Sequence, residues 1–183
     1  LFRSIENSLN ESFYWYLKAS KQGDSQAMLA VAYYYGHGLG TTKNEEKAFE
    51  FYQKALQFGE KEAYYHLGIC YLEGKGVKQD KGKAIALLAL VEDQYNLAAY
   101  LIGQYFKERH DTHEAIHHFK IAIQKEDEEQ SLYQLALYGE QGIEISEDEM
   151  MDYLLRSAKK GYSPALVKYA YYLENGIYVE KDY

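Results

Sequence analysis

The chain has 183 residues, and 47% of them are hydrophobic, which is enough to bury a sizeable core and excludes a disordered tail. No stretch approaches the roughly 20 consecutive apolar residues that a membrane-spanning helix needs, so membrane insertion is not expected. The net charge of −8 disfavours a nucleic-acid partner, because affinity for phosphate backbones rests on clustered Lys and Arg.

The residue usage predicts an all-α fold. Ala, Leu, Lys and Glu are abundant, and the chain contains only one Pro. The first predicted element is a helix around residues 4–20, within a segment that ends at Gly23. When the chain is shifted by 36 residues, Trp15-Tyr16 falls on Phe51-Tyr52 and Lys18-Ala19 falls on Lys54-Ala55. We therefore interpret residues 1–23 as the second helix of a truncated repeat, and we expect the chain to be an excerpt of a longer array.

Two complete repeats follow, at residues 24–59 and 60–95. The same shift of 36 residues places Tyr35 on Tyr71, Gly38 on Gly74 and Gly40 on Gly76 without a gap. A fixed period of this length is typical of a solenoid, in which each unit buries its apolar face by stacking on its neighbours.

The repeat pattern then weakens. Residues 96–126 and 127–161 form two degenerate repeats, and residues 162–183 form a truncated one. The first of these lacks the glycine loop, and the second has Gly142 but carries Glu144 where a second glycine is expected.

Each repeat is predicted to contain two helices. In the first helix, small or apolar residues at relative positions 0, 4, 5 and 8 form one packed face, from Ala63, Leu67, Gly68 and Tyr71 in the second full repeat to Ala165, Tyr169, Ala170 and Leu173 in the last. The predicted N-caps of the second helices are Asn44, Asp80, Asp111 and Ser146, and the glycines expected to end such helices are Gly23, Gly59 and Gly161. The paired glycines follow a helix, unlike a phosphate-binding loop, which follows a strand, so no nucleotide or other cofactor is expected.

One run of residues is similar to a known family. Ten positions between Ala63 and Ala84 fit the pattern A-x3-L-G-x2-Y-x2-G-x-G-V-x2-D-x2-K-A. This run resembles the Sel1-like repeat, a relative of the tetratricopeptide repeat. The resemblance implies an α/α superhelical solenoid that acts as a scaffold or adaptor for protein assembly. It also implies that catalytic residues are absent and that partners bind a concave face lined by the first helices.

Helical geometry identifies the residues expected on that face. With positions 0, 4, 5 and 8 packed, positions 2, 3 and 6 point away from the packed stripe. Positions 2 and 6 supply the candidate residues for binding a protein or peptide, which are Leu29, Tyr33, Tyr65, Ile69, Tyr100, Gln104, Tyr133, Leu137, Val167 and Tyr171. The alternative is that these tyrosines pack between successive helices.

A second motif suggests a different chemistry. Residues 113–117 read HEAIH, which matches the H-E-x-x-H motif of zinc hydrolases. The repeat register places His113 and His117 on the solvent side of a second helix, and no third ligand is evident. A non-catalytic binding scaffold is therefore preferred to a metal-dependent hydrolase, and a structural spacer within a larger protein remains a third possibility. The single cysteine, Cys70, is expected to be buried and inert.

Overall fold

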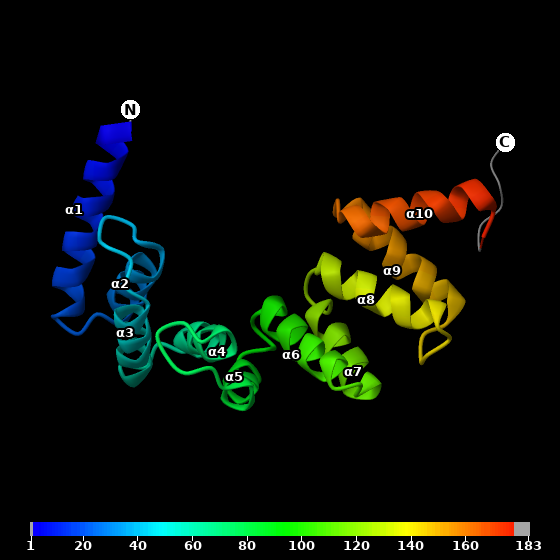
Figure 1. Cartoon of the computed structure of the whole chain (residues 1–183), viewed down its shortest axis with the longest axis horizontal. Coiled ribbons are helices and arrows are strands. Elements are labelled where there is room, and N and C mark those ends of the chain that lie inside the picture. Colours follow the sequence, from blue (N-terminus) through cyan, green and yellow to red (C-terminus); the bar gives the residue numbers. More distant parts are fainter. Residues whose placement is uncertain (1, 178–183) are drawn as a thin grey trace. The chain divides into compact units, whose positions relative to one another are not determined.

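The computed structural model describes the backbone of residues 2–177 and the side chains of residues 7–177. This part of the chain is helical and contains no strand, so the predicted all-α class is confirmed (Figure 1). Its helices are α1 (Phe2–Ser20), α2 (Ser25–His37), α3 (Glu45–Gln57), α4 (Ala63–Glu73), α5 (Lys81–Leu88), α6 (Asn96–Glu108), α7 (Thr112–Ala122), α8 (Glu129–Glu140), α9 (Glu147–Lys159) and α10 (Ser163–Asn175). None of the described helices is both long and apolar enough to span a bilayer.

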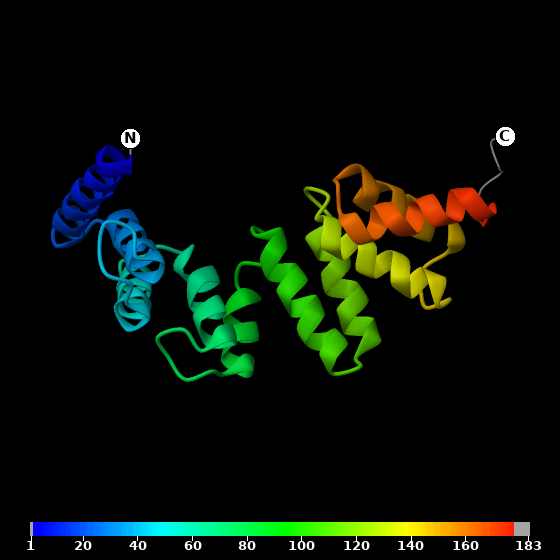
Figure 2. The same ribbon diagram turned by 45° about the horizontal axis from the view of Figure 1, so that its top comes forward.

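Internal contacts divide the chain into two units, residues 1–91 and residues 92–183. In the first unit, α2 pairs with α3 and α4 pairs with α5, while α1 packs against α2 and α3 packs against α4. In the second unit, α6 pairs with α7 and α8 pairs with α9, and the next contacts join α7 to α8 and α9 to α10 (Figure 2). Helices α2, α4, α6, α8 and α10 are the first helices of their repeats.

The predicted packing face of the first helices is buried in the four repeats that begin at α2, α4, α6 and α8. In α4, for example, Ala63, Leu67 and Gly68 are buried and Tyr71 is half-buried. The prediction is wrong for the last repeat, because Ala170 and Leu173 are exposed on α10. The described residues contain no second helix after α10 to cover them. The same face is also wider than predicted, since Met28, Ala99 and Leu132 at position 1 are buried too.

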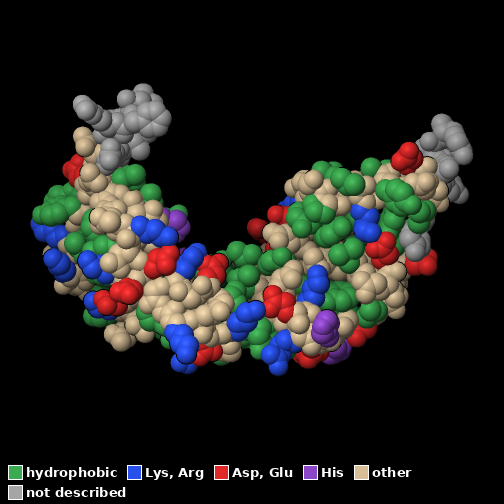
Figure 3. All heavy atoms as spheres, in the orientation of Figure 1, with side chains coloured by type: hydrophobic (Ala, Val, Ile, Leu, Met, Phe, Trp, Pro, Cys, Tyr) green, Lys and Arg blue, Asp and Glu red, His purple; other side chains and the backbone are tan. Residues whose placement is uncertain are grey.

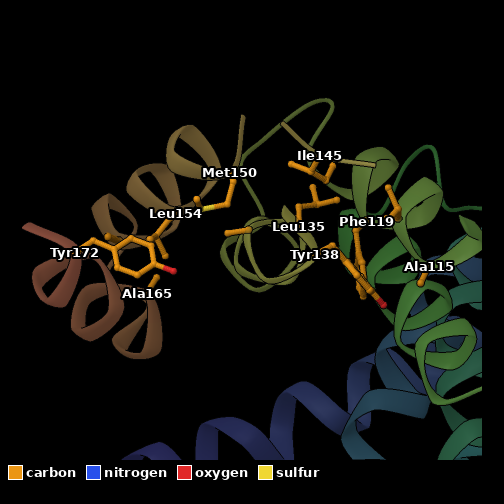
Figure 4. Close-up of a cluster of buried hydrophobic side chains, with 12 residues drawn as sticks. Ala115, Phe119, Leu135, Tyr138, Ile145, Met150, Leu154, Ala165 and Tyr172 are labelled. Carbon is orange, nitrogen blue, oxygen red and sulfur yellow. The ribbon is translucent and has the colours of Figure 1, made fainter. Parts of the chain in front are cut away.

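Glycines in the first helices let the paired second helices approach closely. A Cβ built on Gly68 would lie 2.7 Å from Leu88 Cγ, and one on Gly103 would lie 2.7 Å from the ring of Phe119. On Gly139 it would lie 2.6 Å from Met150 Cβ. Figure 4 shows Phe119 of α7, Leu135 of α8 and Met150 of α9 within one buried cluster of the second unit.

The predicted helix ends are confirmed. The side chains of Asn44, Asp80, Asp111 and Ser146 each accept a hydrogen bond from a backbone N–H in the first turn of the second helix that follows. Ser146 and Glu149 form a complete capping box. Gly23, Gly59 and Gly161 lie just beyond α1, α3 and α9, with φ values of 93°, 92° and 88°.

The second glycine of each glycine loop brings one repeat against the backbone of the preceding one. Gly76 has a φ of 69°, and a Cβ there would collide with the backbone carbonyl oxygen of Glu45 at the start of α3. Gly40, with a φ of 59°, approaches the backbone of Leu9 in α1 in the same way. Both positions therefore need a left-handed backbone and the absence of a side chain.

The repeat at residues 127–161 has a side-chain contact in place of this backbone contact. Glu144 stands where the second glycine is expected and still has a positive φ of 53°. Its carboxylate lies 3.3 Å from Nδ1 of His113, near the start of α7. The loop therefore still reaches the second helix of the preceding repeat.

We expect Gly68→Leu to lower the free energy of unfolding by about 1–3 kcal/mol, because the added side chain overpacks the space held by Leu88. Urea unfolding followed by circular dichroism measures this. Gly82→Leu is the control, since Gly82 is exposed on α5 and a Cβ there meets nothing closer than 3.5 Å. Equal losses of stability for the two variants would contradict close helix packing at Gly68.

We expect Gly76→Ala to destabilise the first unit more than Gly59→Ala, by at least about 1 kcal/mol, because alanine at residue 76 displaces the backbone of α3. Both glycines have positive φ, so both variants carry the cost of a left-handed alanine, but a Cβ on Gly59 meets nothing within 4 Å. The same urea titration compares them. A Gly76 variant no less stable than the Gly59 variant would show that the loop contact is unimportant.

Candidate functional site

The first unit contains a pocket of 510 Å³ between the first helices α2 and α4, here called the α2–α4 pocket. Helix α3 lies behind it, and the loops after α2 and α4 form part of its rim. Its principal lining side chains are Tyr33 and His37 of α2, Tyr52 of α3, Tyr65, His66, Ile69 and Cys70 of α4, and Lys43, Glu45 and Lys75.

Aromatic and imidazole rings stack in pairs around this pocket. The ring centroids of Tyr33 and His37 are 4.0 Å apart, and the ring of His66 stacks on Tyr52 at 4.7 Å and an angle of 8°. The ring of Tyr65 meets His66 edge-on at 5.3 Å. These contacts hold the rings in fixed orientations, so the pocket presents rigid apolar walls.

Two lysines and one glutamate stand at the rim. Lys43 Nζ lies 2.7 Å from Glu45, and Lys75 forms an ion pair with Glu73. The hydrogen bond from Lys43 lowers the pKa of Glu45, with a further contribution from the charge of Lys75. Both lysines are therefore close enough to the carboxylate of Glu45 to lower its pKa.

Burial shifts the pKa values of groups deeper in the pocket in the direction that favours their neutral forms. Burial lowers the pKa of His66, although Glu62 opposes the shift at 3.6 Å from Nε2. Burial also raises the pKa of Tyr52 well above its ordinary value and raises that of Cys70 to about 11. Cys70 is buried as predicted, and its thiol stays protonated at neutral pH, which makes it a poor nucleophile.

The second unit contains a more open hollow of 520 Å³ between α8 and α10, here called the α8–α10 pocket. It is lined by Tyr133 of α8 and by Ser163, Pro164, Val167, Lys168 and Tyr171 of α10. Hydrophobic side chains gather over α10 on the face shown in Figure 3, and the exposed fraction of Val167 reaches 69%.

The one cation of this second pocket is already neutralised. Lys168 Nζ donates hydrogen bonds of 2.8 and 2.7 Å to the two carboxylate oxygens of Glu140, which also accepts a 2.6 Å bond from the hydroxyl of Tyr172. Desolvation opposes these bonds, but they lower the pKa of Glu140 on balance.

Six of the ten candidate residues from the sequence line the two pockets. Tyr33, Tyr65 and Ile69 line the α2–α4 pocket, and Tyr133, Val167 and Tyr171 line the α8–α10 pocket. In each case the residues come from neighbouring first helices of one unit.

The other four candidates lie outside these two pockets. Leu29 packs against the buried clusters of the first unit. The Tyr100 hydroxyl accepts a 3.0 Å hydrogen bond from Gln104, and its ring lies 6.0 Å from that of Phe119. Leu137 is half-buried on α8. Tyr100 and Tyr133 also pack against the core of the second unit, so the packing alternative describes part of their contacts.

Sequence reasoning did not select several polar side chains that line the pockets. His66 and Lys168 both occupy position 3, which the helical geometry already pointed away from the packed face. Helical periodicity was therefore sufficient to identify His66 and Lys168 as candidates. Lys43 and Lys75 lie in loops, where helical periodicity gives no direction.

The HEAIH segment lies on α7, and none of its residues lines either pocket. His113 and His117 are exposed as predicted, and the imidazole of His113 lies against Glu144. The next residue, His118, is buried; its Nδ1 lies 2.7 Å from Glu92 Oε2, and its ring stacks on Phe106. Within residues 7–177, no three His, Cys, Asp or Glu side chains are grouped so that they could hold a metal ion.

Comparison with known proteins identifies similar sequences and folds. The profile of the Sel1 repeat matches residues 3–24, 25–57, 61–90, 91–127, 130–162 and 163–183. No curated protein sequence gives a significant match.

Two solved structures are similar over nearly the whole chain. One is a Sel1 repeat protein from Oxalobacter formigenes, with 22% identity and a TM-score of 0.83 over 100% of this chain and 76% of that protein. Another is c5321, a protective antigen of uropathogenic Escherichia coli with an SLR fold, with 20% identity and a TM-score of 0.75 over 97% of this chain and 50% of that protein. At these identities the structures show a shared fold. The six matched repeats cover most of the sequence and establish that the chain belongs to the Sel1 repeat family.

Proposed function

We propose that the chain is a non-catalytic scaffold that binds a protein or peptide along the exposed face of its first helices. The observation that carries this proposal is the grouping of six candidate residues into two pockets, each between neighbouring first helices of one unit. Such grouping is expected of a binding face and is not required for helix stacking.

The chemistry of the pockets suits polypeptide recognition. Tyrosine offers rigid apolar area together with a hydroxyl that fixes orientation, and it is enriched among residues that dominate interface energies. Tyr33 and Tyr171 are 45% and 54% exposed, so a partner could cover them without unfolding the repeat. The pocket volumes fall within the roughly 300–1,000 Å³ that is common for ligand sites.

A metal-dependent hydrolase is less well supported. A catalytic zinc needs several protein ligands and a site shielded from water, whereas His113 and His117 lie exposed on the side of α7. The imidazole of His113 instead lies 3.3 Å from the carboxylate of Glu144 in the loop of the next repeat.

The binding proposal can be tested by selecting ligands from a displayed library of random peptides on the full chain. We expect peptides that lose at least about tenfold in affinity when Tyr33→Ala and Ile69→Ala are combined, because these side chains supply apolar contact area in the α2–α4 pocket. Fluorescence anisotropy measures the change. Tyr14→Ala is the matched control, since Tyr14 is 57% exposed on α1 and does not line the pocket.

We expect a second class of selected peptides to depend on the α8–α10 pocket. Val167→Asp should weaken their binding at least about tenfold, because it places a carboxylate among the apolar contacts of that pocket. The neighbouring Leu166 is 48% exposed on the same helix and does not line the pocket, so Leu166→Asp should leave affinity unchanged. Failure to select any peptide that is sensitive to either pocket would favour the structural-spacer alternative.

A further inference from the structure

The net negative charge of the chain comes from its second unit. Residues 1–91 contain 11 Lys and Arg against 10 Asp and Glu, whereas residues 92–183 contain 9 against 18. The first unit is therefore close to neutral, with a net charge of +1, and the second carries −9. On the face shown in Figure 3, side chains of both signs are interspersed over the first unit. An acidic ligand would meet little general repulsion from the first unit.

The α2–α4 pocket is the more basic of the two pockets. Lys43 and Lys75 stand at its rim, each in an exposed ion pair, and Glu45 is the one acidic residue that lines it. In the α8–α10 pocket, both oxygens of Glu140 bind the one lysine. A preference for acidic ligands is therefore expected of the first pocket and not of the second.

The two lysines can exchange their present partners for a ligand. The side chains of Lys43 and Lys75 are 59% and 52% exposed, and the carboxylates that they contact are 36% and 45% exposed. Exposed ion pairs of this kind contribute little to stability, because water screens them and holding two long side chains costs entropy. Lys75 also lies between Gly74 and Gly76, whose left-handed backbones fix the loop that carries it.

Below this rim the pocket is apolar. Tyr33, Tyr65 and Ile69 come from the two first helices, and Ala48 and Gly36 leave the space between them open. An aromatic or large aliphatic side chain would be held by contact with these rigid walls, and a carboxylate one or two residues away would reach the rim.

We propose that the α2–α4 pocket binds a segment of a partner protein in which an aromatic or large aliphatic side chain enters the pocket and an adjacent Asp or Glu lies against Lys43 and Lys75. This assignment rests on the proposed binding function and specifies its ligand. Charge complementarity and the apolar interior together define the occupant.

Three labelled peptides of equal length test the assignment on the full chain. Each carries a central Phe flanked by Glu, by Gln or by Lys, and fluorescence anisotropy measures its affinity. The Glu-flanked peptide should bind at least about tenfold more tightly than the Lys-flanked peptide, with the Gln-flanked peptide between them, and added salt should reduce the difference. Equal affinities, or preference for the Lys-flanked peptide, would overturn the assignment.

Lys75→Glu and Lys78→Glu form a matched pair of variants. Both reverse one exposed charge in the same loop, but Lys78 does not line the α2–α4 pocket. We expect Lys75→Glu to remove the preference for the Glu-flanked peptide and Lys78→Glu to leave it within about twofold of the original. Equal effects of the two variants would show a general field rather than a specific contact, and would also overturn the assignment.

The outcomes also separate this inference from the proposed function. If peptides that depend on Tyr33 are selected but are neutral or basic, the binding scaffold stands and the acidic specificity is wrong. If neither the library nor the three peptides yield binding that depends on Tyr33 and Ile69, the α2–α4 pocket is not a peptide site.

Discussion

The close approach of paired helices is the constraint on which the rest of the structure depends. A single repeat has too little apolar area to fold alone, so it is stabilised by stacking on its neighbours. In the described chain α2, α4, α6 and α8 each contact their own second helix, and α4, α8 and α10 contact the second helix of the preceding repeat. Gly68, Gly103 and Gly139 make the first of these contacts possible, because the side chains of Leu88, Phe119 and Met150 occupy the space that a Cβ would need. The glycine loops make a second contact, in which Gly76 lies against the backbone of α3.

The pockets follow from this stacking. Once the small residues fix the first helices against the second helices, part of the opposite face stays exposed, as at Tyr33 of α2 and at Val167 and Tyr171 of α10. Hollows lie between α2 and α4 and between α8 and α10, and residues of α3 also line the first of them. The tyrosines around it are oriented by stacking with histidines, as with Tyr33 on His37 and Tyr52 on His66. The packing that stabilises a repeat therefore also orders the surface proposed to bind a partner.

Much of this arrangement could be predicted from the sequence, because repeat period and capping chemistry are local signals. The spacing of Ala63, Leu67 and Gly68 predicted the buried face of α4, and Asn44 and Asp80 predicted the starts of α3 and α5. The candidate face was harder to predict. Helical periodicity predicts the direction in which a side chain points, but it does not predict which residues that side chain contacts. Tyr100 and Leu29 point along the same face as Tyr33, yet they contact core residues. Lys43 and Lys75 lie in loops, where helical periodicity does not predict side-chain direction. The exposure of Ala170 and Leu173 depends on which helices surround α10.

The most direct test of the account is to map where a selected peptide touches the full chain. A peptide carrying a photoreactive side chain can be cross-linked and the modified residues located by mass spectrometry. The account predicts cross-links on the first helices and the rims of the two pockets, around Tyr33 and Ile69 or around Tyr133 and Tyr171. Cross-links confined to the outward faces of the second helices, such as the side of α7 that carries His113 and His117, would contradict it.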